Sequence, residues 1–351
     1  MRTRALALPA VAFAALALTL TTPAGATTAW ADSVVTTIPL GGTPSGGSPF
    51  GVAITPDGTR AYVPITGNRV SVIDTSTNAV TVTVTGTNAN QPRGVAITPD
   101  GTRVYVTYLD DKMSVIDSAT NTVTETIRVG PAGTTIWNTA TVAITPDGTR
   151  AYVTNDKSGT VFVVDTATNT VNGTIPVGSN PWDVAFTPDG TRAYVTNWGV
   201  STVSVIDTAT NTVTETIPVR SGSRGVAITP DGTRAYVTNS GDNTVAVIDT
   251  ATNTVTGTPI RVGQRPYGVA ITPDGTRAYV TNSADNTVSV IDTATNRVTG
   301  TIPTGKSPAE VAITPDGTRA YVTNQGSEGP GTVSVIDTTK PNPKPPTFGS
   351  S

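Results

Sequence analysis

The sequence predicts an all-β protein, a seven-bladed β-propeller with four-stranded blades. The segment Thr-Pro-Asp-Gly-Thr-Arg occurs seven times, and successive copies are 42 to 47 residues apart. That spacing is typical of one propeller blade. The chain after the N-terminal segment shows no helical period of 3.6 residues. The seven copies begin at Thr55, Thr98, Thr145, Thr187, Thr229, Thr272 and Thr314.

Each repeat contains four short segments rich in Val, Thr, Ile and Tyr, which favour β-strands. In the fourth repeat these segments are residues 184–187, 192–197, 202–207 and 212–219. Pro188-Asp189-Gly190 separates the first two, and this composition is typical of a hairpin turn. The third segment is apolar on both faces, as expected for a blade packed between two neighbours. The fourth contains a proline, which suits an outer edge.

The two ends of the repeat region predict how the ring closes. The seventh repeat lacks a fourth strand, because residues 332–337 lead directly into Lys340-Pro341-Asn342-Pro343. Residues 33–41 instead resemble the fourth strand of the other repeats. An N-terminal strand that completes the last blade would close the ring and cover an exposed sheet edge. We therefore expect the propeller to span residues 32–339.

The second strand of most repeats carries the motif Tyr-Val-Thr-Asn. It occurs at residues 194–197 and again in repeats where it begins at Tyr152, Tyr236, Tyr279 and Tyr321. On these residues, the region 33–339 closely resembles the YVTN-family β-propeller repeat proteins, which include bacterial exported proteins and archaeal surface-layer proteins. The first two repeats depart from the motif at residues 62–65 and 105–108. The resemblance implies a seven-bladed fold and an exported, often surface-associated protein, but no defined catalytic residues.

The N-terminus has the pattern of a secretory signal peptide over residues 1–31. A basic start with Arg2 and Arg4 is followed by an apolar run over residues 5–20 and by Ala29-Trp30-Ala31, a cleavage pattern. Residues 24–26 offer a second possible cleavage site. A membrane anchor is the alternative, but the apolar run is short for a span. With residues 340–351 as a Pro-rich disordered tail, we expect a secreted or cell-surface protein.

The composition argues against several classes of function. The chain contains no His and no Cys, which removes the usual general acid–base side chain and the commonest ligands of transition metals. We therefore expect no metal and no cofactor. The formal net charge is −3 and becomes −5 without Arg2 and Arg4. No basic cluster is present, which argues against nucleic-acid binding.

Comparison of the repeats locates the candidate site. The Thr-Pro-Asp-Gly and Asp-Thr-Ala-Thr-Asn turns should share one nearly constant face, and the remaining loops should form a variable face. The two residues before each Val-Ala-Ile segment, or its equivalent, should ring the mouth of the central channel on the variable face. These pairs are Phe50-Gly51, Arg93-Gly94, Ala140-Thr141, Trp182-Asp183, Arg224-Gly225, Tyr267-Gly268 and Ala309-Glu310.

Five of these pairs contain Arg or a large aromatic residue, the types that dominate binding hot spots. Three tryptophans remain after signal removal, and all are expected in loops of the variable face, which should also present Tyr108, Asp110, Asp111, Lys112 and Glu328. Exposed aromatics beside charges suit sugar rings or peptide side chains; the equally weighted alternative is that they cap the blade ends. The candidate ligand-binding residues are Phe50, Arg93, Trp137, Trp182, Asp183, Trp198, Arg224, Tyr267 and Glu310.

The Asp and Arg residues present in every repeat are expected to be structural. An aspartate such as Asp207 should accept backbone hydrogen bonds in its turn, and an arginine such as Arg192 should pair with a nearby carboxylate.

The sequence leaves three functions open, and we expect the first, which is not enzymatic, because no catalytic set of residues is recognisable. The first is a monomeric binding or scaffold protein that recognises a glycan, peptide or protein on the variable face. The second is an enzyme of the lactonase or lyase type, with Asp183 and Glu310 as acid and base and with Arg93 or Arg224 stabilising an oxyanion. The third is a purely structural envelope protein. No catalytic residues are assigned in the first and third cases.

Overall fold

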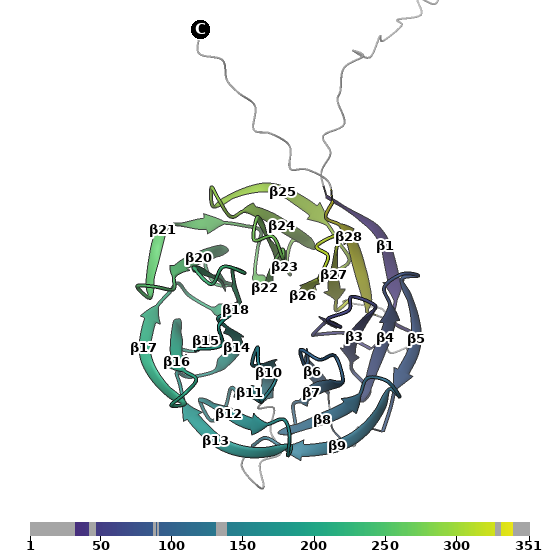
Figure 1. The fold of residues 1–351 in the computed structure, drawn as a ribbon. Helices are drawn as coiled ribbons and strands as arrows, with labels where there is room; N and C mark the ends of the chain where they lie inside the picture. The colour runs from purple at the N-terminus through teal and green to yellow at the C-terminus, as the bar shows by residue number, and fades with distance from the viewer. Residues whose placement is uncertain are drawn as a thin grey trace, which may run out of the picture.

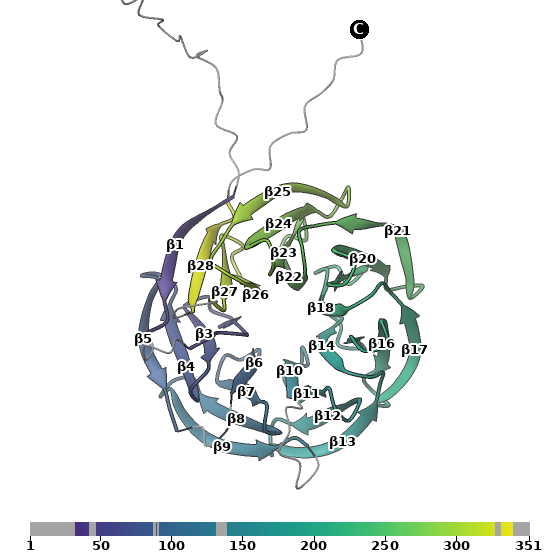
Figure 2. The ribbon, with the colours of Figure 1, turned by 180° about the vertical axis from the view of Figure 1, so that it is seen from behind.

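In a computed structural model of the chain, seven four-stranded antiparallel sheets form a ring, as Figures 1 and 2 show from its two sides. The structure describes residues 32–41, 47–86, 89, 91–130, 139–326 and 331–339. The seven-bladed propeller predicted from the repeats is therefore confirmed. Within the described ranges no helix has the length and apolarity needed to cross a membrane. The predicted signal peptide and tail lie outside the described residues.

The strands of each blade follow the chain from the axis outward, except in the last blade. Blade 1 contains β2 (Ala53–Ile54), β3 (Arg60–Ile65), β4 (Arg69–Asp74) and β5 (Ala79–Val84). Blade 2 contains β6 (Pro92–Ile97), β7 (Arg103–Tyr108), β8 (Lys112–Asp117) and β9 (Thr122–Arg128). Blade 3 contains β10 (Thr139–Ile144), β11 (Arg150–Asn155), β12 (Thr160–Asp165) and β13 (Thr170–Pro176). Blade 4 contains β14 (Pro181–Phe186), β15 (Arg192–Asn197), β16 (Thr202–Asp207) and β17 (Thr212–Pro218).

The remaining blades repeat this order. Blade 5 contains β18 (Ser223–Ile228), β19 (Arg234–Asn239), β20 (Thr244–Asp249) and β21 (Thr254–Arg261). Blade 6 contains β22 (Pro266–Ile271), β23 (Arg277–Asn282), β24 (Thr287–Asp292) and β25 (Arg297–Pro303). Blade 7 contains β26 (Pro308–Ile313), β27 (Arg319–Asn324), β28 (Thr332–Asp337) and β1 (Ser33–Pro39).

The apolar core lies between neighbouring blades. In β16 the side chains of Val203, Ser204, Val205 and Ile206 are all buried, so both faces of this strand are covered. Val203 and Val205 belong to a cluster that also includes residues of β18, β19 and β20 in the next blade. The prediction that the third strand is covered on both faces is therefore confirmed. Packing between blades, rather than within one, buries most of the apolar surface.

The repeated polar residues join each blade to the next. The hydroxyl of Tyr194 donates to Asn253 Oδ1 at 2.6 Å. The guanidinium of Arg192 donates to the carbonyl oxygen of Thr250. The pairing of these arginines with carboxylates was therefore wrong at this junction, because the partner is a backbone carbonyl. Asp207 accepts the backbone N–H of Thr210 at 2.8 Å, which confirms a structural role in its turn.

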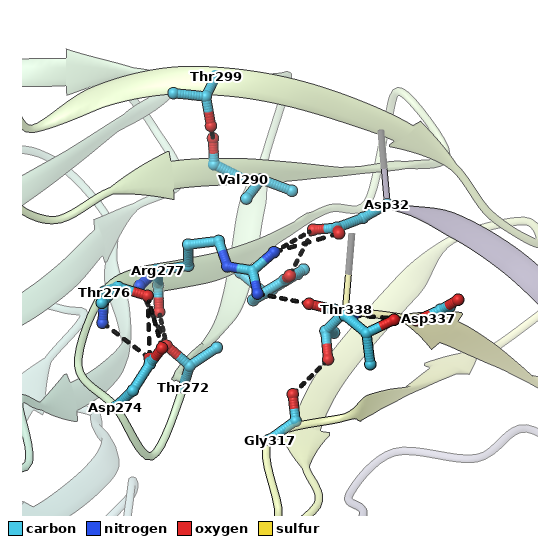
Figure 3. Close-up of polar contacts among 12 residues, drawn as sticks. Asp32, Thr272, Asp274, Thr276, Arg277, Val290, Thr299, Gly317, Asp337 and Thr338 are labelled. Atoms are coloured by element: carbon cyan, nitrogen blue, oxygen red, sulfur yellow. Dashed lines mark hydrogen bonds and ion pairs between the residues drawn. The ribbon is translucent and has the colours of Figure 1, made fainter. Parts of the chain in front are cut away.

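The ring closes as predicted, through an N-terminal strand. β1 (purple in Figure 1) pairs antiparallel with β28 (yellow), and Ser33 lies opposite Asp337. Asp32 stands just before this strand and is almost fully buried. Its carboxylate lies 3.1 Å from Arg277 Nη1, and the same guanidinium donates to the carbonyl oxygen of Thr338 (Figure 3). Asp32 also accepts the hydroxyl hydrogen of Tyr279. At this junction Asp32 thus takes the place of the turn asparagine.

Candidate functional site

In blades 2 to 7 the first strand begins before the Val-Ala-Ile segment or its equivalent, earlier than predicted, and this changes the position of the site residues. Pro181 pairs with Asn197 and Val184 pairs with Val195, so Trp182 and Asp183 together oppose a single residue of β15. This arrangement is a β-bulge. Trp182 therefore lies inside the strand, and the prediction of a loop position was wrong. The same shift of register occurs in the other blades numbered 2 to 7.

Buried threonines hold the bulges in place. Thr196, the threonine of the Tyr-Val-Thr-Asn motif, is fully buried. Its hydroxyl oxygen accepts the N–H of Asp183 at 3.0 Å and its hydroxyl hydrogen is donated to the carbonyl oxygen of Arg224 in the next blade. The sequence analysis did not assign this residue a role, although its recurrence in the second strand of most repeats was visible. The equivalent bond to the next blade is made by Thr154, Thr238, Thr281 and Thr323.

The variable face carries a cavity of about 620 Å³ at the mouth of the channel, which we call the outer cavity. Five of the predicted site residues line it from the inner strands and the segment before β2. Loops of blades 5 to 7 complete its rim, including Arg265 and Lys306. The described residues that line this cavity include four cationic side chains and no carboxylate. The five predicted residues are Phe50, Arg93, Trp182, Arg224 and Tyr267.

These five side chains form one stacked set, which we call the arginine–aromatic layer. The guanidinium carbon of Arg93 lies 4.5 Å from the centre of the Phe50 ring and 5.4 Å from that of Trp182. The guanidinium carbon of Arg224 lies 4.7 Å from the Trp182 ring and 4.6 Å from the Tyr267 ring. Trp182 and Tyr267 meet edge to face at 5.7 Å. Cation–π contacts therefore fix both arginines beside the cavity.

Both arginines retain unused hydrogen-bonding capacity. The Nε atoms of Arg93 and Arg224 are buried and have no hydrogen-bond partner among the described residues. Burial lowers the pKa of Arg224, but the ordinary pKa of a guanidinium group is so high that Arg224 stays charged. Burial raises the pKa of Tyr267 to about 12, so this phenol is neutral. The layer therefore presents two positive charges and neutral rings, a combination suited to an anionic ligand.

A second cavity of about 180 Å³, the inner cavity, lies deeper along the inner strands. Phe50, Arg93, Trp182 and Tyr267 of the layer line it, and so do Asp183, Glu310 and Thr141. Asp183 and Glu310 line only this cavity, and Arg224 lines only the outer one. The structure thus brings the two candidate carboxylates together, on the far side of the layer from the channel mouth.

The two carboxyl groups share an environment that favours protonation. Asp183 accepts the backbone N–H of Val184 at 2.9 Å and that of Val226, in the next blade, at 3.0 Å. Burial nevertheless raises the pKa of Asp183 to about 6. Burial, reinforced by the charge of Asp183, raises the pKa of Glu310 well above its ordinary value, while the charge of Arg224 opposes that rise. Burial and the charge of the neighbouring carboxyl group thus both favour the protonated form of Glu310.

A glycine in the neighbouring blade makes room for Glu310. A Cβ atom at Gly268 would lie 2.4 Å from Glu310 Oε2 and 2.8 Å from the carbonyl oxygen of Ala309. Such distances are too short for any side chain, so the position suits only glycine. Glu310 therefore reaches into the inner cavity across the backbone of blade 6.

The remaining predicted residues lie elsewhere. Trp198 is 44% exposed in the loop after β15, its ring 6.0 Å from the guanidinium carbon of Arg224, and it lines neither cavity. Trp137 and Glu328 lie outside the described residues.

Tyr108 and Asp111, expected on the variable face, are fully buried. Tyr108 ends β7, and Asp111 accepts a hydrogen bond from Asn155 Nδ2 at 3.1 Å. Among the described residues, no cluster of three acidic side chains is arranged to hold a metal ion.

Comparison with known proteins identifies the family to which the chain belongs. No curated protein matches it. Its structure is similar to that of Kuenenia stuttgartiensis hydrazine synthase, with a TM-score of 0.75, 26% identity, and coverage of 85% of this chain and 97% of that chain. Residues 69–341, well over half of the sequence, match the family model described as Lactonase, 7-bladed beta-propeller. The narrower resemblance to YVTN repeat proteins stays a prediction. The match over most of the propeller shows that the chain belongs to the lactonase family of seven-bladed β-propellers.

Proposed function

We propose that this protein hydrolyses a small anionic lactone within the channel. The observation that carries the proposal is the pair formed by Asp183 and Glu310, which lies behind two stacked arginines. Membership of the lactonase family supports the reaction class. The cationic lining of the outer cavity supports an anionic substrate. We therefore propose an enzyme, the second of the three functions that the sequence leaves open.

In the proposed reaction, the two carboxyl groups have different roles, because Glu310 is protonated while Asp183 is ionised. Ionised Asp183 takes a proton from a water molecule as that water attacks the lactone carbonyl carbon. Protonated Glu310 gives its proton to the ring oxygen as the C–O bond breaks, so the product is the hydroxy acid. Arg93, which also lines the inner cavity, stabilises the negative charge on the carbonyl oxygen in the transition state. Groups with separated pKa values suit this division of roles.

The test is hydrolysis of six-membered lactones that carry a carboxylate or phosphate substituent, followed by titration of the released acid. Asp183→Asn and Glu310→Gln should each lower kcat/KM by about a hundredfold or more, the usual contribution of a positioned acid or base. Asp242→Asn is the matched control, because Asp242 lies on the same face and pairs with Arg220 at 3.9 Å. Turnover that persists in both site variants would rule out this mechanism.

A second candidate is binding without turnover. The outer cavity has a polar rim that includes Ser240, Ser283 and Asn286, and this rim supports recognition of a glycan, peptide or protein. In that case a ligand would quench or shift tryptophan fluorescence without being consumed, and the double replacement of Trp182 and Trp198 would abolish binding. Export, on the grounds of the signal pattern in residues 1–31, is part of both proposals.

A further inference from the structure

The two cavities are lined by different charged side chains. The outer cavity contains three cations that the inner cavity lacks, Arg224, Arg265 and Lys306. The inner cavity contains the two carboxyl groups that the outer cavity lacks, Asp183 and Glu310. A molecule that uses both sets of groups must therefore extend from one cavity into the other.

Four side chains line both cavities, so the two cavities adjoin there. These are Phe50, Arg93, Trp182 and Tyr267 of the arginine–aromatic layer. The inner cavity, about 180 Å³, is much smaller than the outer one, about 620 Å³. The small compartment therefore suits a compact ring, and the large one suits the rest of a molecule.

Trp182 contacts three other members of the arginine–aromatic layer. Its ring lies 5.4 Å from the guanidinium carbon of Arg93, 4.7 Å from that of Arg224 and 5.7 Å from the ring of Tyr267. Its carbonyl oxygen accepts the hydroxyl hydrogen of Thr154 at 3.1 Å, which anchors the backbone at the bulge. Asp183 follows it in the same bulge. The indole is thus held in place on several sides where the two cavities adjoin.

We infer that Trp182 determines specificity by limiting the size of the lactone ring that reaches the inner cavity. This inference rests on the proposed hydrolase function. It assigns the preference for an unfused ring to one side chain, Trp182. A fused or heavily substituted ring would be excluded by the indole rather than by the carboxyl groups.

The experiment compares a compact lactone, δ-valerolactone, with a fused one, dihydrocoumarin, in the full-length protein. Trp182→Ala should raise kcat/KM for dihydrocoumarin relative to δ-valerolactone by about tenfold or more, which is the range that a change of pocket size produces. Trp182→Phe should have a smaller effect. Val200→Ala is the control, because Val200 is an exposed apolar residue on the same face that lines neither cavity, and it should leave the ratio unchanged.

A second readout does not depend on turnover. Calorimetric binding of the two ring-opened acids, 5-hydroxyvalerate and 3-(2-hydroxyphenyl)propionate, should show the same change of preference in Trp182→Ala. If no lactone is hydrolysed but the binding preference changes, the proposed hydrolase function fails and the role of Trp182 as a size filter stands. If the preference of Trp182→Ala and Trp182→Phe matches that of the unaltered protein in binding, the inference is overturned. Circular dichroism of each variant confirms that it is folded.

Discussion

Individual buried side chains at the blade junctions hold the residues of the site in place. A β-bulge leaves a backbone N–H without its normal partner in the sheet, and buried N–H groups must be satisfied. Thr196 accepts that N–H from Asp183 and donates to Arg224 across the junction. One buried hydroxyl group thus holds two site residues on adjacent blades. Blade 1 has Pro64 at this position, and there the N–H of Gly51 donates directly to the carbonyl oxygen of Arg93 at 3.0 Å.

The burial of Asp183 should make stability depend on pH. Burial raises the pKa of Asp183 from 3.8 to about 6, so its protonated form is favoured in the folded state. The stability of the protein is therefore highest below about pH 4 as far as this group is concerned, and that contribution to the free energy of unfolding is lost as pH rises through about 6. Asp183→Asn should therefore raise the free energy of unfolding at pH 7 by on the order of 1 kcal/mol, allowing for screening by channel water. At pH 4 the variant should match the unaltered protein. Urea unfolding at pH 4, 5.5 and 7 checks this, and parallel curves would contradict it.

Among the strands, β1 has the most particular role, because it joins the two ends of the propeller. Six junctions place a tyrosine hydroxyl against a turn asparagine, and examples are Tyr62 with Asn121 at 2.7 Å and Tyr321 with Asn78 at 2.7 Å. The seventh uses Asp32, whose carboxylate also pairs with Arg277. An aspartate fits because no connecting turn supplies an asparagine between β28 and β1. The ion pair between Asp32, which is almost fully buried, and Arg277 therefore links β1 to the neighbouring blade.

Removal of this carboxylate should loosen the closing strand. Asp32→Ala leaves Arg277 without its ion-pair partner and the hydroxyl of Tyr279 without an acceptor, so unfolding free energy should fall by about 2–3 kcal/mol. Asp32→Asn restores the side chain found at the other junctions and should recover a large part of that loss. Urea unfolding, together with the rate of proteolysis within residues 33–39, measures both effects. Equal stability of Asp32→Ala and the unaltered protein would show that β-pairing alone closes the ring.

At the scale of the whole molecule, near-identical blades produce one asymmetric site. The constant face repeats one set of contacts, in which the turn proline of each blade packs on the turn glycine of the next, as between Pro188 and Gly232. The variable face places different side chains at equivalent positions, and the axis brings them together. Closure of the ring also pairs or covers the strand edges that would otherwise be exposed. The repeats therefore provide a scaffold, and their differences provide the site.

Because the junctions are equivalent, the point at which the chain opens should be movable. A circular permutant that joins residue 339 to residue 32 through an Asp-Thr-Ala-Thr-Asn turn, and opens at residues 209–210 of blade 4, should fold with a melting temperature within a few degrees of the original. A permutant opened at residues 188–190 should be less stable, because it frees the innermost strand β14 from β15. Thermal unfolding of the two permutants tests this, and equal melting temperatures would contradict the argument.

The positions of the candidate residues, though not their role in binding, could be predicted where a pattern in the chain reports directly on position. Residues before each Val-Ala-Ile segment were expected at the channel mouth, and Phe50, Arg93, Trp182, Arg224 and Tyr267 do meet there. The bulge at Trp182 was missed because register depends on the partner strand, which lies outside the local pattern. The burial of Tyr108 was missed for a similar reason, since packing overrides a position near a strand end.

The number of blades, the presence of four strands in each blade, the turn chemistry and the closure by β1 could be read from the sequence alone, because they follow from local periodicity and from a repeat that the chain carries seven times. Three features emerge only in the folded ring: Asp183 and Glu310 share an inner cavity, two arginines stack between three aromatic rings, and Asp32 pairs with Arg277. They could not be read from the sequence because the residues involved lie far apart along the chain. These contacts join residues from different blades, and their energies depend on burial and on neighbouring charges that exist only when the ring is closed.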